Sequence, residues 1–252
     1  DKCFPELLER WSRGDTNWDT IPNLIFTKGG AIFKTKKDEI YEQDELPVLP
    51  YEKLNDFYSL TGYLGKTYLG SKTIAYHSSF GCPFTCSFCA VVPIYNARWK
   101  GKSAELIYKD VKFLKEKFGG NAIEFHDNNF FVSEKRTVEF SKLIRDEKMI
   151  WWGEGRIDTI DKYSDESLAA MRDAGCKMIF FGAETGNDAL LKKMDKGGTQ
   201  SGAQIVRFAE RMKKFDIIPE YSFVLGTPAA TQQEVMEQID FDIEFIREVK
   251  RI

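Results

Sequence analysis

The chain has 252 residues, 42% hydrophobic and 30% charged, an ordinary composition for a globular protein long enough for one large domain plus an appendage. Its formal net charge of −3 at pH 7 excludes an electrostatic case for nucleic acid or an anionic membrane as main partner. Since the sequence has neither an apolar run of about 18 residues nor a signal-peptide pattern, we expect a cytoplasmic protein with no membrane span.

Residues 1–71 predict a small, open N-terminal segment rather than an independent domain. The chain opens with a helical pattern that places its apolar residues on one face: Phe4, Leu7, Leu8 and Trp11. A strand–turn–strand follows at 23–33, with Gly29-Gly30 as its hairpin turn. Residues 34–50 are charged and interrupted by prolines, which is typical of a linker, and 51–71 show no clear period.

From Lys72 onward the pattern repeats a short β-rich run, a polar turn and an amphipathic helix. The predicted strands are 73–77, 121–126, 149–152, 177–181 and 217–225, and the predicted helices are 103–118, 133–147, 164–174, 199–215 and 231–249. Ser103 and Ser164 are candidate N-caps, and Ala174-Gly175 is a helix stop. Five successive β–α units predict a parallel sheet with right-handed crossovers. Residues 72–252 would then form a barrel or open barrel rather than a doubly wound sheet.

Three cysteines, Cys82, Cys86 and Cys89, follow the first of these strands with the spacing C-x3-C-x2-C. A loop that leaves a strand can bring such thiols together. Structural zinc and the common iron–sulfur clusters normally take four protein ligands, whereas three thiolates leave one corner of a cubic [4Fe–4S] cluster free for a non-protein ligand. The alternatives are a zinc site completed by His77, or a reducible pair formed by Cys86 and Cys89.

The cysteine loop resembles the C-x3-C-Φ-C motif of the radical S-adenosylmethionine (SAM) enzymes, with Phe88 as the aromatic residue Φ. The resemblance implies that Cys82, Cys86 and Cys89 ligate three irons of a catalytic [4Fe–4S] cluster, and that the fourth iron chelates the amino and carboxylate groups of SAM. One electron then cleaves SAM to a 5′-deoxyadenosyl radical, and a flavodoxin or ferredoxin would supply it. The implied fold is a partial, TIM-like (β/α)6 barrel, so a sixth strand is due where the sequence stops at Ile252. We therefore expect a longer protein.

Ligands bind at the carboxyl ends of parallel strands, and two of these ends resemble motifs of the family. Asp127 and Asn128 lie in a run that resembles its D-[DE]-N-F stretch, and the resemblance implies that both contact the methionyl amino group of SAM; the alternative is a simple turn. Arg156 matches an x-R-x-D strand end and would bind the SAM carboxylate in a bidentate manner. The alternative there is a structural pair between Arg156 and Asp158.

The next two strand ends also resemble the family. Glu184 lies in a G-x-E-[ST] motif, which implies a ribose ligand, and residues 187–198 resemble its N-x-x-x-L-x-x-M-x-K-G run. Residues 221–228 resemble F-[IVM]-x-G-x-P, whose backbone around Val224 and Gly226 would lie against adenine. Phe88 would cover the other side of the base, or else serve as a core residue.

Two further segments bear on partners and subfamily. The basic and aromatic run Arg98–Lys102 would suit a nucleic-acid contact, but we expect an ordinary solvated loop. The hairpin and the linker Glu45–Pro50 resemble the junction before the barrel in the cobalamin-binding branch of the family, although the segment could simply cap the barrel. That branch mostly transfers methyl groups to unactivated carbons or to phosphinate phosphorus, and a minority carries out cyclisation or ring contraction.

These resemblances predict a radical SAM methyltransferase in which SAM supplies both the radical and, through methylcobalamin bound outside this chain, the methyl group. One alternative is a cobalamin-free radical SAM oxidoreductase, cyclase or methylthiotransferase. The last normally needs a second cluster, whose ligands Cys3 and Cys176 alone cannot supply. Another is a non-catalytic iron–sulfur or zinc protein. The sequence identifies no substrate, which we expect to be a small molecule.

Overall fold

The computed structural model describes residues 3–38, 40–196 and 200–252. It forms two compact units, Asp1–Tyr41 and Glu42–Ile252, each of which is described by itself below. Within the described ranges, no helix is long and apolar enough to cross a membrane.

The first unit contains the predicted helix and hairpin. Helix α1 spans Cys3–Ser12, and the antiparallel strands β1 (Ile25–Lys28) and β2 (Ala31–Lys34) follow it. The turn between the strands is Gly29-Gly30, and both glycines have positive φ, 60° and 81°, the left-handed conformation that glycine adopts without a steric penalty. Both predictions are confirmed.

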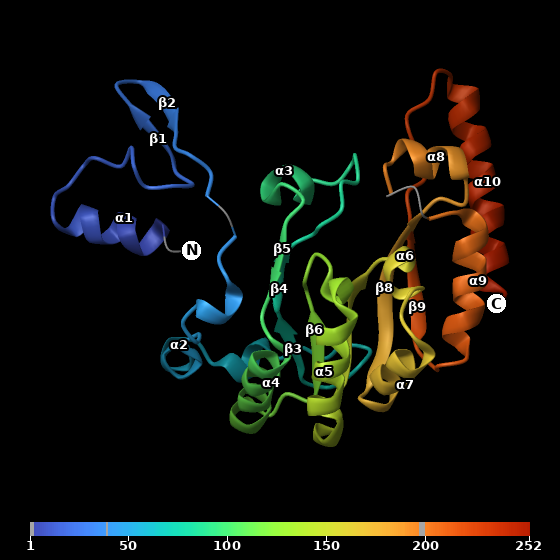
Figure 1. The fold of residues 1–252 in the computed structure, drawn as a ribbon, viewed down its shortest axis with the longest axis horizontal. Helices are drawn as coiled ribbons and strands as arrows, with labels where there is room; N and C mark the ends of the chain where they lie inside the picture. The colour runs from blue at the N-terminus through green and yellow to red at the C-terminus, as the bar shows by residue number, and fades with distance from the viewer. Residues whose placement is uncertain (1–2, 39, 197–199) are drawn as a thin grey trace. The chain divides into compact units, whose positions relative to one another are not determined.

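A five-stranded parallel sheet forms the centre of the second unit (Figure 1). Its strands are β3 (Thr73–Tyr76), β6 (Ala122–Phe125), β7 (Ile150–Gly155), β8 (Cys176–Glu184) and β9 (Ile218–Phe223). They lie in the same order in the sheet as in the chain, and every pairing is parallel. Because the strand order never reverses, the sheet has no switch point and is an open part of a barrel. The predicted fold class is therefore confirmed.

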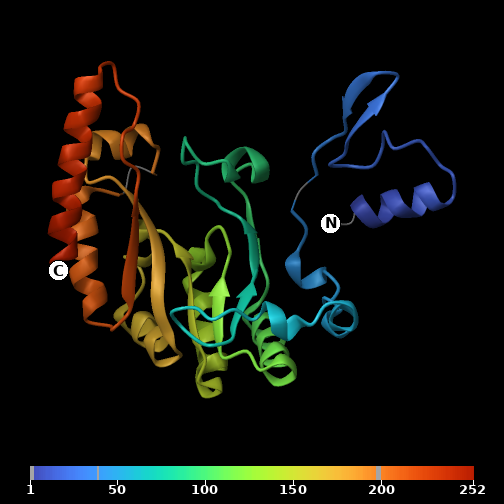
Figure 2. The same cartoon turned by 180° about the vertical axis from the view of Figure 1, so that it is seen from behind.

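The helices predicted after each strand are all present. They are α4 (Ala104–Phe118), α5 (Glu134–Ile144), α7 (Asp165–Asp173), α9 (Gly202–Lys213) and α10 (Gln232–Lys250). Ser103 and Ser164 accept hydrogen bonds from the backbone N–H groups of Leu106 and Ser167, at 3.4 and 3.1 Å, as the predicted N-caps should. Helices α4, α5, α7 and α9 lie against one face of the sheet, seen from both sides in Figures 1 and 2.

Short helical elements lie before the sheet and between its strands and helices, and most of them were not predicted from the sequence. Helical turns precede the sheet at η1 (Gln43–Glu45), α2 (Tyr51–Phe57) and η2 (Leu60–Tyr63). Others lie at α3 (Val91–Tyr95), η3 (Phe130–Val132), η4 (Arg145–Glu147), α6 (Ile157–Ile160) and α8 (Asp188–Lys193). Several of them follow the carboxyl end of a strand, where they set the course of the chain around the candidate site.

The expectation that Arg98–Lys102 is a solvated loop is wrong. Trp99–Gly101 forms strand β5, which pairs with β4 (Ser79–Gly81) in an antiparallel ladder. The Trp99 indole donates a hydrogen bond of 3.1 Å to the carbonyl of Asn129, and Lys102 forms an ion pair of 2.7 Å with Asp110. The cysteine loop was predicted to follow the strand at 73–77. It follows β4 instead, a short strand that lies between β3 and the loop.

Aromatic rings fill the layer between the sheet and α5. Phe125 is fully buried, and its ring centroid lies 4.3 Å from that of Phe130, 5.4 Å from that of Phe140 and 5.9 Å from that of Trp151. The contacts with Phe140 and Trp151 are edge-to-face, and packed aromatic rings bury large apolar areas. This cluster therefore fixes the carboxyl end of β6 against the helices.

Replacing Phe125 with alanine should therefore lower the free energy of unfolding by about 3–5 kcal/mol, because the substitution leaves a cavity among rings that cannot collapse freely. Urea unfolding of the two proteins, followed by circular dichroism, measures the difference. Phe57→Ala is the control, because Phe57 is 81% exposed and its loss should change stability by about 0.5 kcal/mol or less. Equal effects of the two substitutions would contradict this packing.

Candidate active site

The cysteine loop runs from Cys82 to Ala90, between β4 and α3, beyond the carboxyl ends of the strands (Figure 1). Its three cysteines are free thiols and partly exposed. Among the described residues, no three His, Cys, Asp or Glu side chains are grouped to hold one metal ion. In an iron–sulfur cluster each thiolate binds a different iron atom, so the three sulfurs need not meet at one point. His77, the fourth ligand of the zinc alternative, stacks on Phe80 with centroids 5.9 Å apart.

The last residue of α8 and the segment after it bind the cysteine loop. The Ser87 backbone N–H donates to the Met194 carbonyl and the Ser87 hydroxyl to the Lys193 carbonyl, each at 3.0 Å. The Thr85 hydroxyl donates to the Asp195 carboxylate at 2.9 Å. These contacts join segments more than 100 residues apart in the chain, and they give a structural role to the described part of the run 187–198. Residues 197–199 of that run lie outside the described residues.

Arg156 follows β7 directly and contacts the cysteine loop at Phe84 and Cys86. Its Nε and Nη2 donate to the two carboxylate oxygens of Asp158, at 2.9 and 2.7 Å, and Nη2 also donates to the Lys196 carbonyl at 2.6 Å. Its Nη1 donates to the sulfur of Cys86 at 3.0 Å. The bidentate face expected to bind the SAM carboxylate is thus occupied by Asp158. The structure contains the Arg156–Asp158 ion pair, which was the alternative prediction.

The guanidinium of Arg156 is only 6% exposed and stacks on the Phe84 ring, 3.9 Å from its centroid. Burial alone would disfavour its charge, but the hydrogen bonds to Asp158 and the proximity of Cys86 outweigh that effect and raise the pKa of Arg156. A permanent cation therefore lies in contact with one of the three thiols.

A second thiol, Cys82, lies against the side chain of Asn129. The amide Nδ2 is 3.9 Å from the Cys82 sulfur, while the amide Oδ1 is buried and has no hydrogen-bond partner in the described part of the chain. Burial raises the pKa of Cys82, and hydrogen bonds from the Phe84 backbone and Asn129 partly oppose the rise. No ligand role was predicted for Asn129, although it occupies the asparagine position of the D-[DE]-N-F stretch.

Asp127 does not fit its predicted contact with the methionyl amino group. Its carboxylate is fully buried; Oδ1 accepts a hydrogen bond from the Ser78 backbone N–H at 2.7 Å. Oδ2 accepts from the hydroxyls of Ser78 and Ser79 at 2.5 and 2.6 Å. Asp127 therefore joins the end of β6 to the start of β4, the strand from which the cysteine loop leaves. The neighbouring Asn128 is exposed and open to a ligand.

Glu184 ends β8 in a conformation that is rare for a residue with a side chain, with φ of +64°. It is 7% exposed, and its Oε1 accepts a hydrogen bond of 3.0 Å from the ammonium group of Lys196. Lys196 also donates to the Gly182 carbonyl at 2.9 Å. A methyl group at Gly182 would lie 2.2 Å from Glu184 Oε1, so the carboxylate folds over this glycine. Lys196 compensates the burial of the charge.

The segment predicted to lie against adenine is open to solvent. Strand β9 ends at Phe223, two residues before its predicted end, and the Val224 backbone N–H donates to the Glu184 carbonyl at 2.8 Å. Val224 is 39% exposed, and Gly226 has φ of +75°. Phe88 is 53% exposed, so its alternative role as a core residue is wrong.

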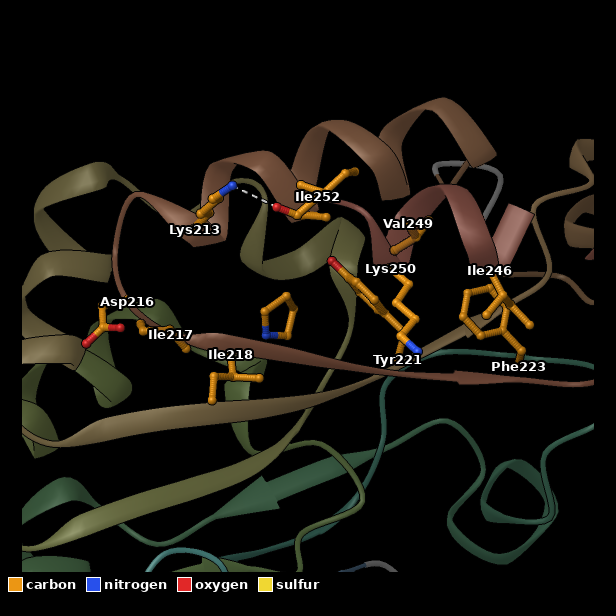
Figure 3. A pocket seen from close by; sticks show the side chains of 12 residues that line it. Lys213, Asp216, Ile217, Ile218, Tyr221, Phe223, Ile246, Val249, Lys250 and Ile252 are labelled. Carbon is orange, nitrogen blue, oxygen red and sulfur yellow. Dashed lines mark hydrogen bonds between the residues drawn. The ribbon is translucent and has the colours of Figure 1, made fainter. Parts of the chain in front are cut away.

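Hydrogen bonds at the strand ends thus connect Cys86, Arg156, Lys196 and Glu184 in series, and a separate contact joins Asn129 to Cys82. A pocket of about 510 Å³ lies elsewhere, at the edge strand β9. Figure 3 shows its lining residues, which come from α9, α10, β9 and its flanks, among them Tyr221 and Ile246. None of the predicted site residues lines this pocket. The chemistry suggested by the cysteines belongs to the strand ends instead.

A family model described as the radical SAM superfamily matches residues 76–241. An uncharacterized methyltransferase of Pyrococcus horikoshii is 28% identical over 242 residues, which is 94% of this chain and 50% of that protein. Bacteriochlorophyllide d C-12(1)-methyltransferase of Chlorobaculum tepidum is 23% identical over 215 residues, 83% of this chain and 46% of that protein. This chain therefore spans about half the length of these curated relatives.

Two solved structures share the fold. The cobalamin-dependent S-adenosylmethionine radical enzyme OxsB, with aqua-cobalamin bound, has a TM-score of 0.75 over 95% of this chain and 34% of its own. The radical S-adenosylmethionine methyltransferase TsrM from Kitasatospora setae, with cobalamin and a [4Fe–4S] cluster bound, has a TM-score of 0.69 over 97% of this chain and 48% of its own. Both are 16% identical to this chain, and at that level the likeness shows the fold alone.

Asp127→Asn tests the structural role assigned to this carboxylate. The amide keeps the shape but weakens the charge-assisted hydrogen bonds from Ser78 and Ser79, so the free energy of unfolding should fall by about 1–3 kcal/mol. The affinity of the cluster-loaded protein for SAM should stay unchanged. Urea unfolding and calorimetric titration with SAM measure the two quantities, with the exposed neighbour Asn128→Ala as a stability control. Weaker SAM binding without loss of stability would restore the ligand role for Asp127.

Proposed function

The chain belongs to the radical SAM superfamily, and from this premise we propose that it binds a [4Fe–4S] cluster through Cys82, Cys86 and Cys89 and cleaves SAM reductively. The superfamily is one of enzymes that use these two cofactors. When bound, the cluster supplies the electron for that cleavage. The single observation that carries the proposal is the C-x3-C-x2-C loop of free thiols, inside the matched region, at the carboxyl ends of the strands.

The surroundings of the thiols suit a cluster. Thiolate ligands are negatively charged, and hydrogen bonds to their sulfurs stabilise that charge. Cys86 accepts such a bond from the Arg156 guanidinium at 3.0 Å, and Cys82 faces the Asn129 amide at 3.9 Å. The buried Asn129 amide oxygen, for which the described residues supply no hydrogen-bond donor, also leaves a polar group beside Cys82 unsatisfied, as expected for a site completed by a ligand.

The remaining strand ends offer groups suited to the parts of SAM. We propose that Glu184 accepts hydrogen bonds from the ribose hydroxyls and that the backbone around Val224 and Gly226 lies against adenine. The half-exposed ring of Phe88 would cover the other face of the base. Exposed Asn128 would accept a hydrogen bond from the methionyl amino group, a role for which the buried Asp127 does not fit.

We further propose that the reaction is a methyl transfer that depends on cobalamin bound outside this chain. Two relatives carry methyltransferase names, and the names of the two solved structures include cobalamin. The β1–β2 hairpin and the linker to Pro50 would form the junction to a cobalamin-binding domain, with residues 1–71 as the N-terminal segment and 72–252 as the barrel. A flavodoxin or ferredoxin would supply the electron, and the substrate would be a small molecule.

Methylthio transfer is the second candidate. The tRNA-2-methylthio-N(6)-dimethylallyladenosine synthase of a Thermoanaerobacter species is 27% identical over 177 residues. That similarity covers 67% of this chain, whereas the similarity to the Pyrococcus methyltransferase covers 94% and includes the hairpin. Cys176 is fully buried in β8, and burial raises its pKa, which makes it a poor ligand for a second cluster. Methyl transfer is therefore the better-supported reaction.

The proposal is tested by formation of 5′-deoxyadenosine. Anaerobically reconstituted protein, supplied with dithionite and SAM, should release 5′-deoxyadenosine, which is quantified by liquid chromatography and mass spectrometry. Cys86→Ala should abolish the product because it removes a cluster ligand. Cys3→Ser is the matched control, since Cys3 lies on α1, outside the matched region, and should retain full product formation. Product formation by Cys86→Ala, or none by the unaltered protein with its cluster intact, would refute the proposal.

A further inference from the structure

The contact between Arg156 and Cys86 points to a role for this arginine that differs from the one its motif implies. We propose that Arg156 is a positioning residue that acts through Cys86: its charged hydrogen bond to the sulfur raises the reduction potential of the cluster. This inference rests on the proposed function, because it requires that Cys86 ligates a [4Fe–4S] cluster.

The guanidinium is held so that one nitrogen can serve only the sulfur. Asp158 fixes Nε and Nη2 through two hydrogen bonds, and the Lys196 carbonyl accepts a further one from Nη2. Phe84 covers one face of the guanidinium plane, with its centroid 3.9 Å away. Nη1 is left directed at the Cys86 sulfur, 3.0 Å away. The donor is therefore oriented before any ligand binds, so its hydrogen bond to sulfur costs little reorganisation.

Two of the three thiols have described donors to their sulfurs, and these donors differ in charge. Cys86 receives a charged donor at 3.0 Å, whereas the donors to Cys82 are neutral: the Phe84 backbone N–H and the Asn129 amide at 3.9 Å. A hydrogen bond from a charged group is about twice as strong as one between neutral groups. One-electron reduction adds negative charge to a cluster, and donors to its sulfurs favour the reduced form. Among the described contacts, the Arg156 bond is therefore the one expected to shift the potential most.

The same guanidinium connects the cysteine loop to the candidate SAM site. Arg156 donates to the carbonyl of Lys196, and the ammonium group of Lys196 donates to Glu184 at the end of β8. Asp158, which orients the guanidinium, is 2% exposed and belongs to the short helix α6. Arg156 is thus held by Asp158, by the Lys196 carbonyl and by the Phe84 ring, and a smaller side chain would remove the cation from a buried ion pair.

The test is a potentiometric titration of the reconstituted protein, with the reduced cluster followed by EPR in the absence of SAM. Arg156→Gln should lower the midpoint potential by at least about 59 mV, a tenfold change in the ratio of reduced to oxidised cluster for one electron. Arg156→Lys keeps the charge but loses the fixed fork, so it should shift the potential in the same direction by less. Arg136→Gln is the matched control. Arg136 is equally buried, at 7% exposure, and the acceptors described for it are oxygens, so its loss should leave the potential unchanged.

The outcomes are distinguishable. A cluster whose potential is the same in the unaltered protein and in Arg156→Gln would overturn the inference and leave the proposed function standing. If Arg156→Gln fails to hold a cluster, Arg156→Lys decides the question: an unchanged potential overturns the inference and a lowered one supports it. Equal shifts in the Arg156 and Arg136 variants would also overturn it, since they would reflect general loosening. No cluster in the unaltered protein would overturn the proposed function together with the inference.

Discussion

The candidate site depends on contacts that fix the cysteine loop, because this short loop has no hydrophobic core of its own. The cysteine loop carries three thiols on nine residues, and every side-chain contact described for these thiols comes from distant strand ends. Arg156 after β7 donates to Cys86, Asn129 after β6 faces Cys82, and the carboxyl end of α8 accepts a hydrogen bond from Ser87. A parallel sheet brings these ends to one edge, so the fold itself supplies the support that the loop lacks.

Buried charge is the second feature of this edge. Arg156 pairs with Asp158 and Lys196 pairs with Glu184, all four being at least nine-tenths buried. Buried ion pairs contribute little net stability, because desolvation offsets their attraction. They hold charged groups in fixed positions, which suits a site that must bind a cluster and a charged cofactor and exclude water. The strained backbone of Glu184, with φ of +64°, is consistent with a functional constraint at the end of β8.

Local patterns in the sequence predicted much of this structure, whereas contacts between segments distant in the chain could not be predicted from them. The five strands and five helices follow from apolar periodicity and from caps such as Ser103, which are properties of neighbouring residues. Strands β4 and β5 have three residues each, too few to show a period. The true partners of Asp127 and Arg156, namely Ser78 and Cys86, lie 49 and 70 positions away. A motif identifies such residues as important without showing what they contact.

The most direct test of the central claim is EPR of the anaerobically reconstituted, dithionite-reduced protein with and without SAM. The account predicts a [4Fe–4S]+ signal whose g values change when SAM is added, because a cluster held by three cysteines has one iron free to bind it. A reduced cluster whose signal is indifferent to SAM would contradict the account. So would zinc in place of iron in anaerobically purified protein; the fold would stand, but the chemistry assigned to the three cysteines would not.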